Sequence, residues 1–304
     1  MNFIIRGVLG LVLFFVLFNV ARNLFYDLYA SNWHRASREN TAGKRVLITG
    51  SSRGIGEALA HVYAELGAHV TVHARRLDSL EKIRAECRRL GAASVHAVAG
   101  DMSSPGRAAQ VVADAAAAMG GGLDIVVVNH ISPSELTTLS RAMPDSAQKQ
   151  LAAMQTNYFS YVEAARAALP HLEKSAGSLV LISSAAARLP IPYCYEYCAS
   201  KRALEGFFST LRQELALNGS AVHAGLAVLG LIGTDSARQT VPKYSKGSNL
   251  DFASPAATAL DVTAIPVGRL RELASPWKMR VPLLLGGWAP EHIERHLQAL
   301  TRIL

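Results

Sequence analysis

Tyr197 and Lys201 are the residues whose types and spacing most directly indicate chemistry. At positions i and i+4 of a helix, two side chains lie on the same face and can contact each other. An ammonium group beside a phenol favours the phenolate and so lowers a pKa that is ordinarily about 10. A tyrosine tuned in this way can exchange a proton with a carbonyl oxygen near neutral pH. Ser184 ends an apolar segment upstream of this pair, where its hydroxyl could hold that oxygen beside the phenol.

The segments around this pair predict a doubly wound parallel sheet. Short apolar segments alternate with segments of helical pattern, and this alternation is typical of α/β folds. The expected strands are 44–49, 68–74, 94–99, 123–128, 179–182 and 222–228, and the expected helices are 57–66, 77–90, 105–119 and 144–174. Ligands of such sheets bind at the carboxyl ends of the strands, where Ser184 also stands.

A glycine-rich turn follows the first expected strand. Gly50, Gly54 and Gly56 stand between a strand and a helix, which is the context that such a motif requires. Glycines let the backbone approach a pyrophosphate, and the phosphate then sits on the positive N-terminus of the helix. We therefore expect a dinucleotide to bind here, with Ser52 and Ile55 in the same turn.

Arginines near this turn favour NADP(H) over NAD(H). Arg75 and Arg76 end the second strand, where an acidic residue would bind a free ribose 2′-hydroxyl and arginine accommodates a 2′-phosphate. Arg53, inside the glycine turn, adds positive charge on the same side. The competing interpretation is a set of solvated surface arginines.

Later strand ends carry further candidate cofactor ligands. Those expected to line the groove from the adenine end onward are Asp101, Met102, Asn129, His130 and Ile131. Thr234, after the strand at 222–228, could cap a helix or bind phosphate, and the two roles are compatible. Asn157 stands among apolar residues of a helix and must find hydrogen-bond partners, at minimum as a core residue that ties backbone together.

Composition narrows the class of protein. The chain of 304 residues is 50% hydrophobic and can bury a sizeable core in one α/β domain or two. Its net charge of +8 is scattered, with no basic segment interleaved with aromatic residues, so nucleic acid is a poor partner. Cys87, Cys194 and Cys198 show neither metal-ligand spacing nor a disulfide framework. Cys194 and Cys198 could form a redox pair, although small buried apolar residues are the favoured interpretation.

The N-terminal residues 1–21 predict a hydrophobic signal anchor, or else a cleaved signal peptide. Residues 7–21 carry no charge, and a span reaches membrane length when it includes residues 3–6. Basic residues lie on both sides, so charge does not orient it. We expect a juxtamembrane linker at 22–43, one folded domain at 44–280 with a substrate lid at 237–262, and a C-terminal tail at 281–304. The tail could cover the substrate mouth, touch membrane or pack on a partner subunit.

Taken together, the turn at 49–56, Asn157, Ser184 and the Tyr197-x-x-x-Lys201 pair resemble the short-chain dehydrogenase/reductase family over residues 44–236. This resemblance implies a Rossmann-type domain and reversible hydride transfer between C4 of nicotinamide and an alcohol or ketone carbon. It assigns Tyr197 as acid/base, Lys201 as the group that lowers its pKa and holds the nicotinamide ribose, and Ser184 as the group that orients the substrate oxygen. Asn157 would anchor a water that leads to Lys201.

Within that family, the segments 90–100, 119–132, 156–162 and 228–237 resemble the 11β-hydroxysteroid dehydrogenase group. That resemblance implies NADP(H), a homodimer, and a catalytic domain anchored in the reticulum lumen or secreted. By position it assigns the 2′-phosphate to Arg53 and Arg75, and the rest of the cofactor to Ile232, Thr234 and Ser236. The expected substrate is a steroid or similar apolar alcohol or ketone.

Two alternatives stay open. The substrate could be a retinoid or xenobiotic carbonyl compound. The chain could also be a vestigial nucleotide-binding protein whose pocket is closed by the cluster at 193–196. Asn218 begins an Asn-Gly-Ser glycosylation pattern, which is relevant only in a lumenal or secreted domain.

Overall fold

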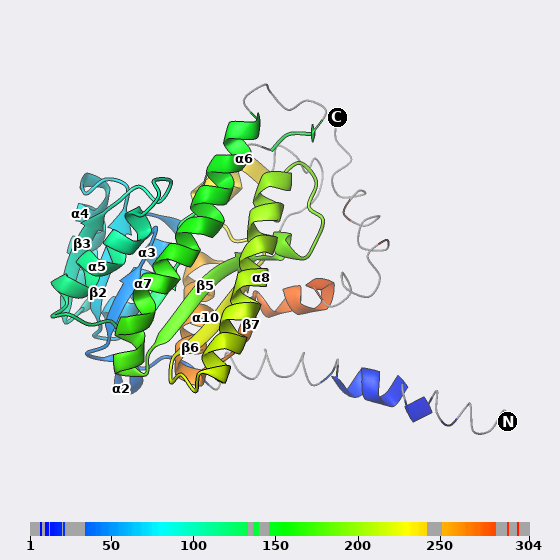
Figure 1. Ribbon diagram of the computed structural model, residues 1–304, viewed down its shortest axis with the longest axis horizontal. Helices are drawn as coiled ribbons and strands as arrows, with labels where there is room; N and C mark the ends of the chain where they lie inside the picture. The colour runs from blue at the N-terminus through cyan, green and yellow to red at the C-terminus, as the bar shows by residue number, and fades with distance from the viewer. Residues whose placement is uncertain are drawn as a thin grey trace.

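The computed structural model describes residues 34–132, 136–139, 146–241 and 251–283, together with positions 7, 10, 11, 13–19, 21, 291 and 297. Its centre is a seven-stranded sheet in the order β3-β2-β1-β4-β5-β6-β7 (Figure 1). Every neighbouring pair of strands is parallel. The predicted α/β fold with a doubly wound parallel sheet is therefore confirmed.

The strands form because their segments are apolar on both faces. Burial of both faces is typical of parallel sheets covered by helices, and it makes such strands continuous apolar segments rather than alternating ones. All four residues of β4 are buried, for example. The strands are β1 Arg45–Ile48, β2 His69–Ala74, β3 Ser94–Ala99, β4 Ile125–Val128, β5 Ser178–Ser184, β6 His223–Leu229 and β7 Glu272–Ser275.

Helices cover the two faces of the sheet as separate layers (Figure 1). One apolar core lies between the sheet and α5, α7 and α8, and the other lies between the sheet and α3, α4 and α10. Neighbouring residues of β1 alternate between the two cores, since Leu47 belongs to the first and Val46 to the second. The helices are α2 Arg38–Thr41, α3 Gly54–Glu65, α4 Asp78–Leu90, α5 Arg107–Ala118, α6 Ser146–Met154, α7 Ser160–Ser175, α8 Tyr195–Leu217, α9 Asp235–Thr240 and α10 Pro255–Gly268.

The end of the segment predicted as a substrate lid, 237–262, is part of the core instead. Residues 255–262 are the first half of α10, which packs against α3 and β7. Ala259 and Val262 are fully buried there. The sequence shows no helical period at this place because α10 is buried on several sides, including the consecutive residues 262–265. Residues 242–250 of the predicted lid lie outside the described residues.

The described part of the predicted juxtamembrane linker packs on the domain. The guanidinium of Arg38, in α2, donates to the carbonyl oxygen of Glu65 over 3.1 Å. Gly43 donates its N–H to the carbonyl oxygen of Gly67 over 3.0 Å. Described positions of the predicted anchor, 13–19, are helical, with Phe14 and Phe15 exposed. Among the helices formed by described residues, none has the length and apolar character needed to cross a membrane.

Candidate active site

The candidate catalytic residues lie at the carboxyl end of β5 and at the start of α8. Ser184 is the last residue of β5 and caps a short 3₁₀ helix, Ala185–Ala187, by accepting the N–H of Ala186 over 3.2 Å. Tyr197 stands in the first turn of α8, and Lys201 stands one turn later. The fold thus brings the two predicted segments together at the sheet edge where ligands of such folds bind.

Lys201 is completely buried. Its Nζ donates to the carbonyl oxygen of Ile182 over 2.8 Å and to the Tyr161 hydroxyl over 3.3 Å. Burial lowers the pKa of Lys201 to about 7, and the Glu205 carboxylate opposes this effect. A lysine with this pKa is present in both its charged and its neutral form near neutral pH, which suits a group that passes protons.

Tyr197 differs from the expectation in one respect. Burial raises the pKa of its hydroxyl to about 12, although the hydroxyl of Ser184 favours the phenolate and opposes that rise. The predicted lowering by Lys201 is not found. Lys201 Nζ lies 5.8 Å from the centre of the Tyr197 ring, and its hydrogen bonds go to Tyr161 and Ile182. Desolvation of the phenol therefore sets the direction of the shift, and Ser184 is the group that opposes it.

Asn157 stands in a π-helical turn, Gln155–Phe159, that separates α6 from α7. Such turns occur mostly as single insertions in α-helices and frequently at functional sites. Its side chain is fully buried, accepts the N–H of Ser132 over 2.8 Å and donates to the Ser200 hydroxyl over 3.1 Å. Ser200 in turn donates to the carbonyl oxygen of Tyr197 over 2.9 Å. Asn157 thus ties the segment after β4 to the first turn of α8, while its predicted link to Lys201 through a water stays a prediction.

Tyr161 is a site residue that sequence reasoning missed. It is fully buried and donates its hydroxyl to the carbonyl oxygen of His130 over 2.8 Å, while it accepts from Lys201. Burial raises its pKa well above the ordinary value, so it stays protonated. The available signal was its position four residues after Asn157, which places both on one helix face.

The glycine turn is shaped so closely that side chains are excluded from it. Gly50 and Gly54 have φ values of +67° and +63°, in the left-handed region. A Cβ on Gly56 would lie 2.2 Å from the carbonyl oxygen of Gly50, and a Cβ on Gly50 would lie 2.7 Å from the Cα of His130. The Asn129 side chain donates to the carbonyl oxygen of Gly50 over 3.2 Å, and this bond ties the end of β4 to the turn.

His73, at the end of β2, is a second residue that sequence reasoning missed. Its Nδ1 accepts the N–H of Gly50 over 3.1 Å, and its Nε2 lies 3.0 Å from the carbonyl oxygen of Gly100. Because a carbonyl only accepts, the proton of this neutral ring stands on Nε2. Burial lowers the pKa of His73 to about 4, so the ring stays neutral under ordinary conditions. His73 therefore joins the glycine turn to the end of β3.

His130 is bonded within the protein as well. Its ring nitrogens lie 2.8 Å from the Thr49 hydroxyl and 2.7 Å from the Ser160 hydroxyl, and the residue is buried. Its neighbour Ile131 is 57% exposed, which leaves this apolar side chain available to a ligand. Of this predicted pair, only Ile131 has an exposed side chain.

The basic residues predicted to read a 2′-phosphate lie around the start of α3 and the end of β2. Arg53 immediately precedes α3, Arg75 follows β2, and both are exposed. The charge of Arg75 contributes to the lowered pKa of Asp101, although hydrogen bonds from Ser103 contribute most. Arg76 Nε lies 3.5 Å from Asp78 in an exposed pair.

The remaining predicted cofactor residues divide between groove and core. Thr234 caps α9 by accepting the N–H of Ala237 over 3.3 Å, and a Cβ on Gly54 would lie 3.0 Å from its methyl group. It therefore stands across the glycine turn. Asp101 and Ser236 are exposed, and Ser52 and Ile55 are half-buried. Met102 and Ile232 were predicted to bind the cofactor. Their side chains are buried in the two apolar cores, so their contribution is to position the backbone.

These features fit a phosphorylated dinucleotide. Two positive-φ glycines and a third that admits no Cβ leave the backbone open at the N-terminus of α3, where a pyrophosphate would sit. Exposed arginines flank this place. Tyr197 and Lys201 would hold the nicotinamide end.

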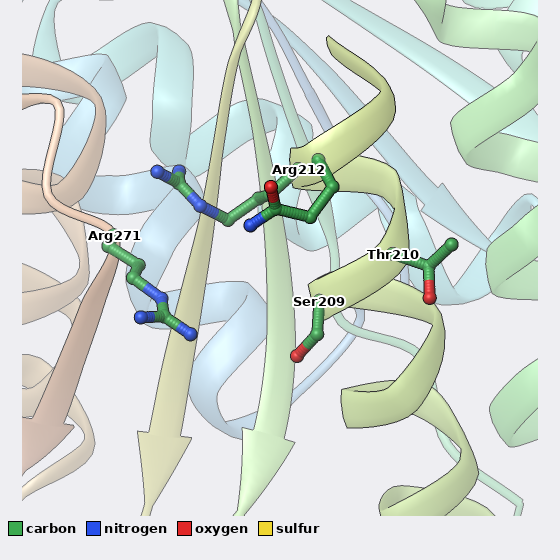
Figure 2. Close-up of a pocket in the computed structure, with 5 residues that line it drawn as sticks. Ser209, Thr210, Arg212 and Arg271 are labelled. Atoms are coloured by element: carbon green, nitrogen blue, oxygen red, sulfur yellow. The ribbon is translucent and has the colours of Figure 1, made fainter. Parts of the chain in front are cut away.

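A pocket lies elsewhere on the molecule, along the later part of α8 (Figure 2). Arg212 and Arg271 point into the space between α8 and the start of β7. Arg212 also donates to the carbonyl oxygen of Ala224, near the start of β6. The pocket is lined by Ser209, Thr210, Arg212, Gln213 and Arg271. It therefore lies at the opposite ends of the strands from Ser184 and Tyr197.

Comparison with known families decides the class. The family model described as short chain dehydrogenase matches residues 44–245. The chain belongs to the short-chain dehydrogenase family. The family resemblance expected from the motifs is confirmed, and this short-chain dehydrogenase is an oxidoreductase that acts on alcohol groups.

Named relatives place this short-chain dehydrogenase further. It is 41% identical over 263 residues to the hydroxysteroid 11-beta-dehydrogenase 1-like protein of Xenopus tropicalis, covering 86% of this chain and 89% of the relative. It is 42% identical over 240 residues to the protein of that name from Gallus gallus, covering 79% of this chain and 80% of the relative.

Solved structures are similar as well. The L-sorbose reductase of Gluconobacter frateurii, complexed with NADPH and L-sorbose, has a TM-score of 0.67 and 26% identity, with 77% of this chain and 95% of that chain covered. A short chain dehydrogenase from Burkholderia cenocepacia in complex with NADP has a TM-score of 0.67 and 27% identity, with 77% and 97% covered.

Proposed function

We propose that this enzyme uses NADP(H) to interconvert a hydroxyl and a ketone on a steroid or a similar apolar molecule. The observation that carries the proposal is the convergence of Ser184, Tyr197 and Lys201 at the carboxyl end of β5, beside a glycine turn flanked by exposed arginines. When bound, the cofactor supplies or accepts the hydride. The chain itself handles the proton and the orientation of the reacting oxygen.

In the direction of reduction, Tyr197 acts as the general acid. A hydroxyl with a pKa of about 12 is protonated at neutral pH and holds the proton that the new alkoxide requires. Ser184 holds the carbonyl oxygen next to this hydroxyl. Lys201, whose pKa is about 7, then returns a proton to the tyrosinate. Tyr161 keeps Lys201 Nζ at this place through its 3.3 Å hydrogen bond.

The preference for NADP(H) rests on charge around the glycine turn. Arg53, inside the turn, and Arg75, after β2, are both exposed and carry the charge that a 2′-phosphate requires. Both solved structures named above that hold a nicotinamide cofactor hold its phosphorylated form.

The steroid class rests on the relatives, whose names refer to hydroxysteroid dehydrogenases. An apolar substrate also agrees with exposed apolar side chains among the described residues after β4. Ile131 follows β4 and is 57% exposed, and Leu139 is 73% exposed. A retinoid or another apolar carbonyl compound would use the same surface, so the substrate panel must include them.

The surroundings of the enzyme belong to the proposal too. We infer a homodimer in which α7 and α8 pair, and attachment to the reticulum membrane through residues 3–21 with the catalytic domain in the lumen. The alternative is secretion after cleavage. Phe159, which precedes α7, is 49% exposed and would be covered by such a partner. Asn218 is exposed just after α8, where a lumenal enzyme could add a glycan.

The test is oxidation of NADPH, with NADH in parallel, by the purified full chain in detergent. Cortisone, retinal and a simple aromatic ketone would be supplied in turn, and Tyr197→Phe is the matched control because it removes only the hydroxyl. We expect turnover with NADPH and cortisone that the variant lacks. Turnover that survives in Tyr197→Phe would refute the proton-transfer role. Tight NADPH binding without turnover on every substrate would favour the vestigial alternative.

A further inference from the structure

Two thiols flank Tyr197 at the start of α8. Cys194 immediately precedes the helix, Cys198 stands in its first turn, and their sulfur atoms lie 3.5 Å apart. Both thiols also converge on one carbonyl oxygen, that of Ile191, at 3.4 Å for Cys194 and 3.8 Å for Cys198. The sequence favoured two unconnected buried apolar residues. Direct contact between the sulfurs is a property that such a role does not require.

A bond between the two sulfur atoms would require a change in the backbone at the start of α8. A disulfide needs Cβ atoms about 3.5–4.5 Å apart, whereas residues four apart inside a helix have Cβ atoms about 5–6 Å apart. Cys194 is the N-cap residue of α8, with φ −127° and ψ 41° outside the helical region, and its carbonyl oxygen accepts the N–H of Cys198 over 2.9 Å. Closing the remaining gap would require a small contraction of the first turn of α8.

We propose that Cys194 and Cys198 form a redox-active dithiol, which is oxidised to a disulfide by exchange with a small-molecule disulfide such as oxidised glutathione. The Cys198 thiolate attacks one sulfur of the reagent, breaks its S–S bond and releases one thiolate. The Cys194 thiolate then attacks the Cys198 sulfur, forms the internal S–S bond and expels the second thiolate. The chain loses two electrons and two protons, and the reagent gains them as two thiols.

The pKa values of the two cysteines are shifted in opposite directions, as the two steps of this exchange require. The contact with Cys194 lowers the pKa of Cys198, and the contact with Cys198 together with burial raises the pKa of Cys194. Cys198 is therefore the attacking thiol, and it is half-buried, so a small reagent can reach it. Cys87 is a natural internal control, because it is fully buried in α4 and burial raises its pKa to about 12.

The bond would act on Tyr197, which lies between the two cysteines in the chain. Contraction of the first turn moves the tyrosine hydroxyl relative to Ser184, and a displacement of about 1 Å can cost about 100-fold in rate. This consequence for turnover rests on the proposed function. Formation of the disulfide does not rest on the proposed function, because it is measured by mass spectrometry and not by activity.

The first experiment exposes the full chain to excess oxidised glutathione and maps its thiols by alkylation and peptide mass. We expect one peptide in which Cys194 and Cys198 have lost two hydrogens, while Cys87 remains alkylated. Cys194→Ser should instead trap a glutathione adduct on Cys198, and Cys87→Ser should respond as the parent chain does. A stable glutathione adduct on the parent chain, or unreacted Cys194 and Cys198, would overturn the proposal.

The second experiment measures NADPH-dependent reduction of cortisone before oxidation, after it, and after treatment with dithiothreitol. We expect kcat to fall by about 10- to 100-fold on oxidation and to return on reduction. Cys198→Ser, compared with its own untreated rate, should not respond. Equal turnover of both forms would overturn the effect on Tyr197. If the reduced chain has no activity, the proposed function fails, while the mass result still decides the dithiol.

Discussion

The hydroxyl oxygen of Tyr161 lies 3.3 Å from Nζ of Lys201, and both residues are completely buried. Tyr161 belongs to the helix after β4, and Lys201 belongs to the helix after β5. Because Tyr161 also donates to the carbonyl oxygen of His130, the bond connects the ends of two central strands through the lysine. Lys201 is therefore held by the core rather than by Tyr197.

Tyr161→Phe should shift the pH dependence of turnover. The Tyr161 hydroxyl accepts from Lys201 and so favours its charged form. Its loss should move the pKa of Lys201 further below about 7, and the limb of the kcat/KM profile that reports Lys201 should move to lower pH. The profile would be measured with NADPH and the best ketone substrate. An unchanged profile with lower stability would leave Tyr161 a purely structural residue.

Lys201 should also make folding stability depend on pH. Its folded pKa of about 7 lies below the unfolded value of 10.5, so the unfolded chain binds more protons between these values. Stability should therefore rise with pH from about 7 to 10.5, by an amount on the order of 3–5 kcal/mol. Urea denaturation of the parent chain and Lys201→Met at several pH values measures this. Lys201→Met should lack this rise. If the free energy of unfolding of both proteins changes with pH in parallel, the lowered pKa of the buried Lys201 is contradicted.

His73→Leu should weaken the glycine turn. The change leaves the N–H of Gly50 and the carbonyl oxygen of Gly100 without their partner, at a cost of about 1–3 kcal/mol in the free energy of unfolding. The affinity for NADPH, measured by fluorescence titration, should fall because this turn is the proposed site of the pyrophosphate. His96→Leu, at a half-buried histidine of β3, is the control. Equal effects from the two changes would argue against a special role for His73.

Arg75→Ala and Arg76→Ala form a matched pair for the choice of cofactor. Arg76 is paired with Asp78, whereas the charge of Arg75 acts on Asp101. We expect Arg75→Ala to weaken NADPH binding by about 10- to 100-fold, as a lost charged hydrogen bond would, and to leave NADH binding nearly unchanged. Arg76→Ala should have the smaller effect. Calorimetric titration with both cofactors measures these affinities. Equal losses of affinity for NADPH and NADH would contradict a 2′-phosphate site.

Arg188→Met should destabilise the chain strongly. Arg188 lies 2.7 Å from Glu205 and 2.6 Å from Glu272, with all three side chains largely buried. Removal of the arginine breaks its ion pair with Glu205, and loss of one member of a buried pair costs about 3–5 kcal/mol. Arg84→Met, which breaks an exposed pair with Glu81, is the control and should cost less than about 1 kcal/mol. Similar denaturation midpoints for the two variants would refute this ranking.

Much of the fold and the candidate site could be predicted because the relevant patterns are local. The apolar segments before Gly50 and Ser184, the spacing of the three glycines, and the i, i+4 relation of Tyr197 and Lys201 depend only on nearby residues. Backbone geometry converts such patterns into strands, a turn and a shared helix face without reference to the rest of the chain. The order of alternating elements then leaves few topologies.

Only the tertiary structure decided the pKa shifts and the hydrogen-bond partners of the charged and polar groups. The pKa of Lys201 falls and that of Tyr197 rises because helices and strands distant in sequence bury Lys201 completely and Tyr197 in part. The hydrogen bonds of His73 join three separate strand ends, and the sulfur atoms of Cys194 and Cys198 lie 3.5 Å apart at the start of α8. The segment that forms helix α10 shows no helical period in the sequence because the helix is buried on several sides. Sequence determines which groups are present and their local spacing, while burial and long-range contacts determine their protonation and partners.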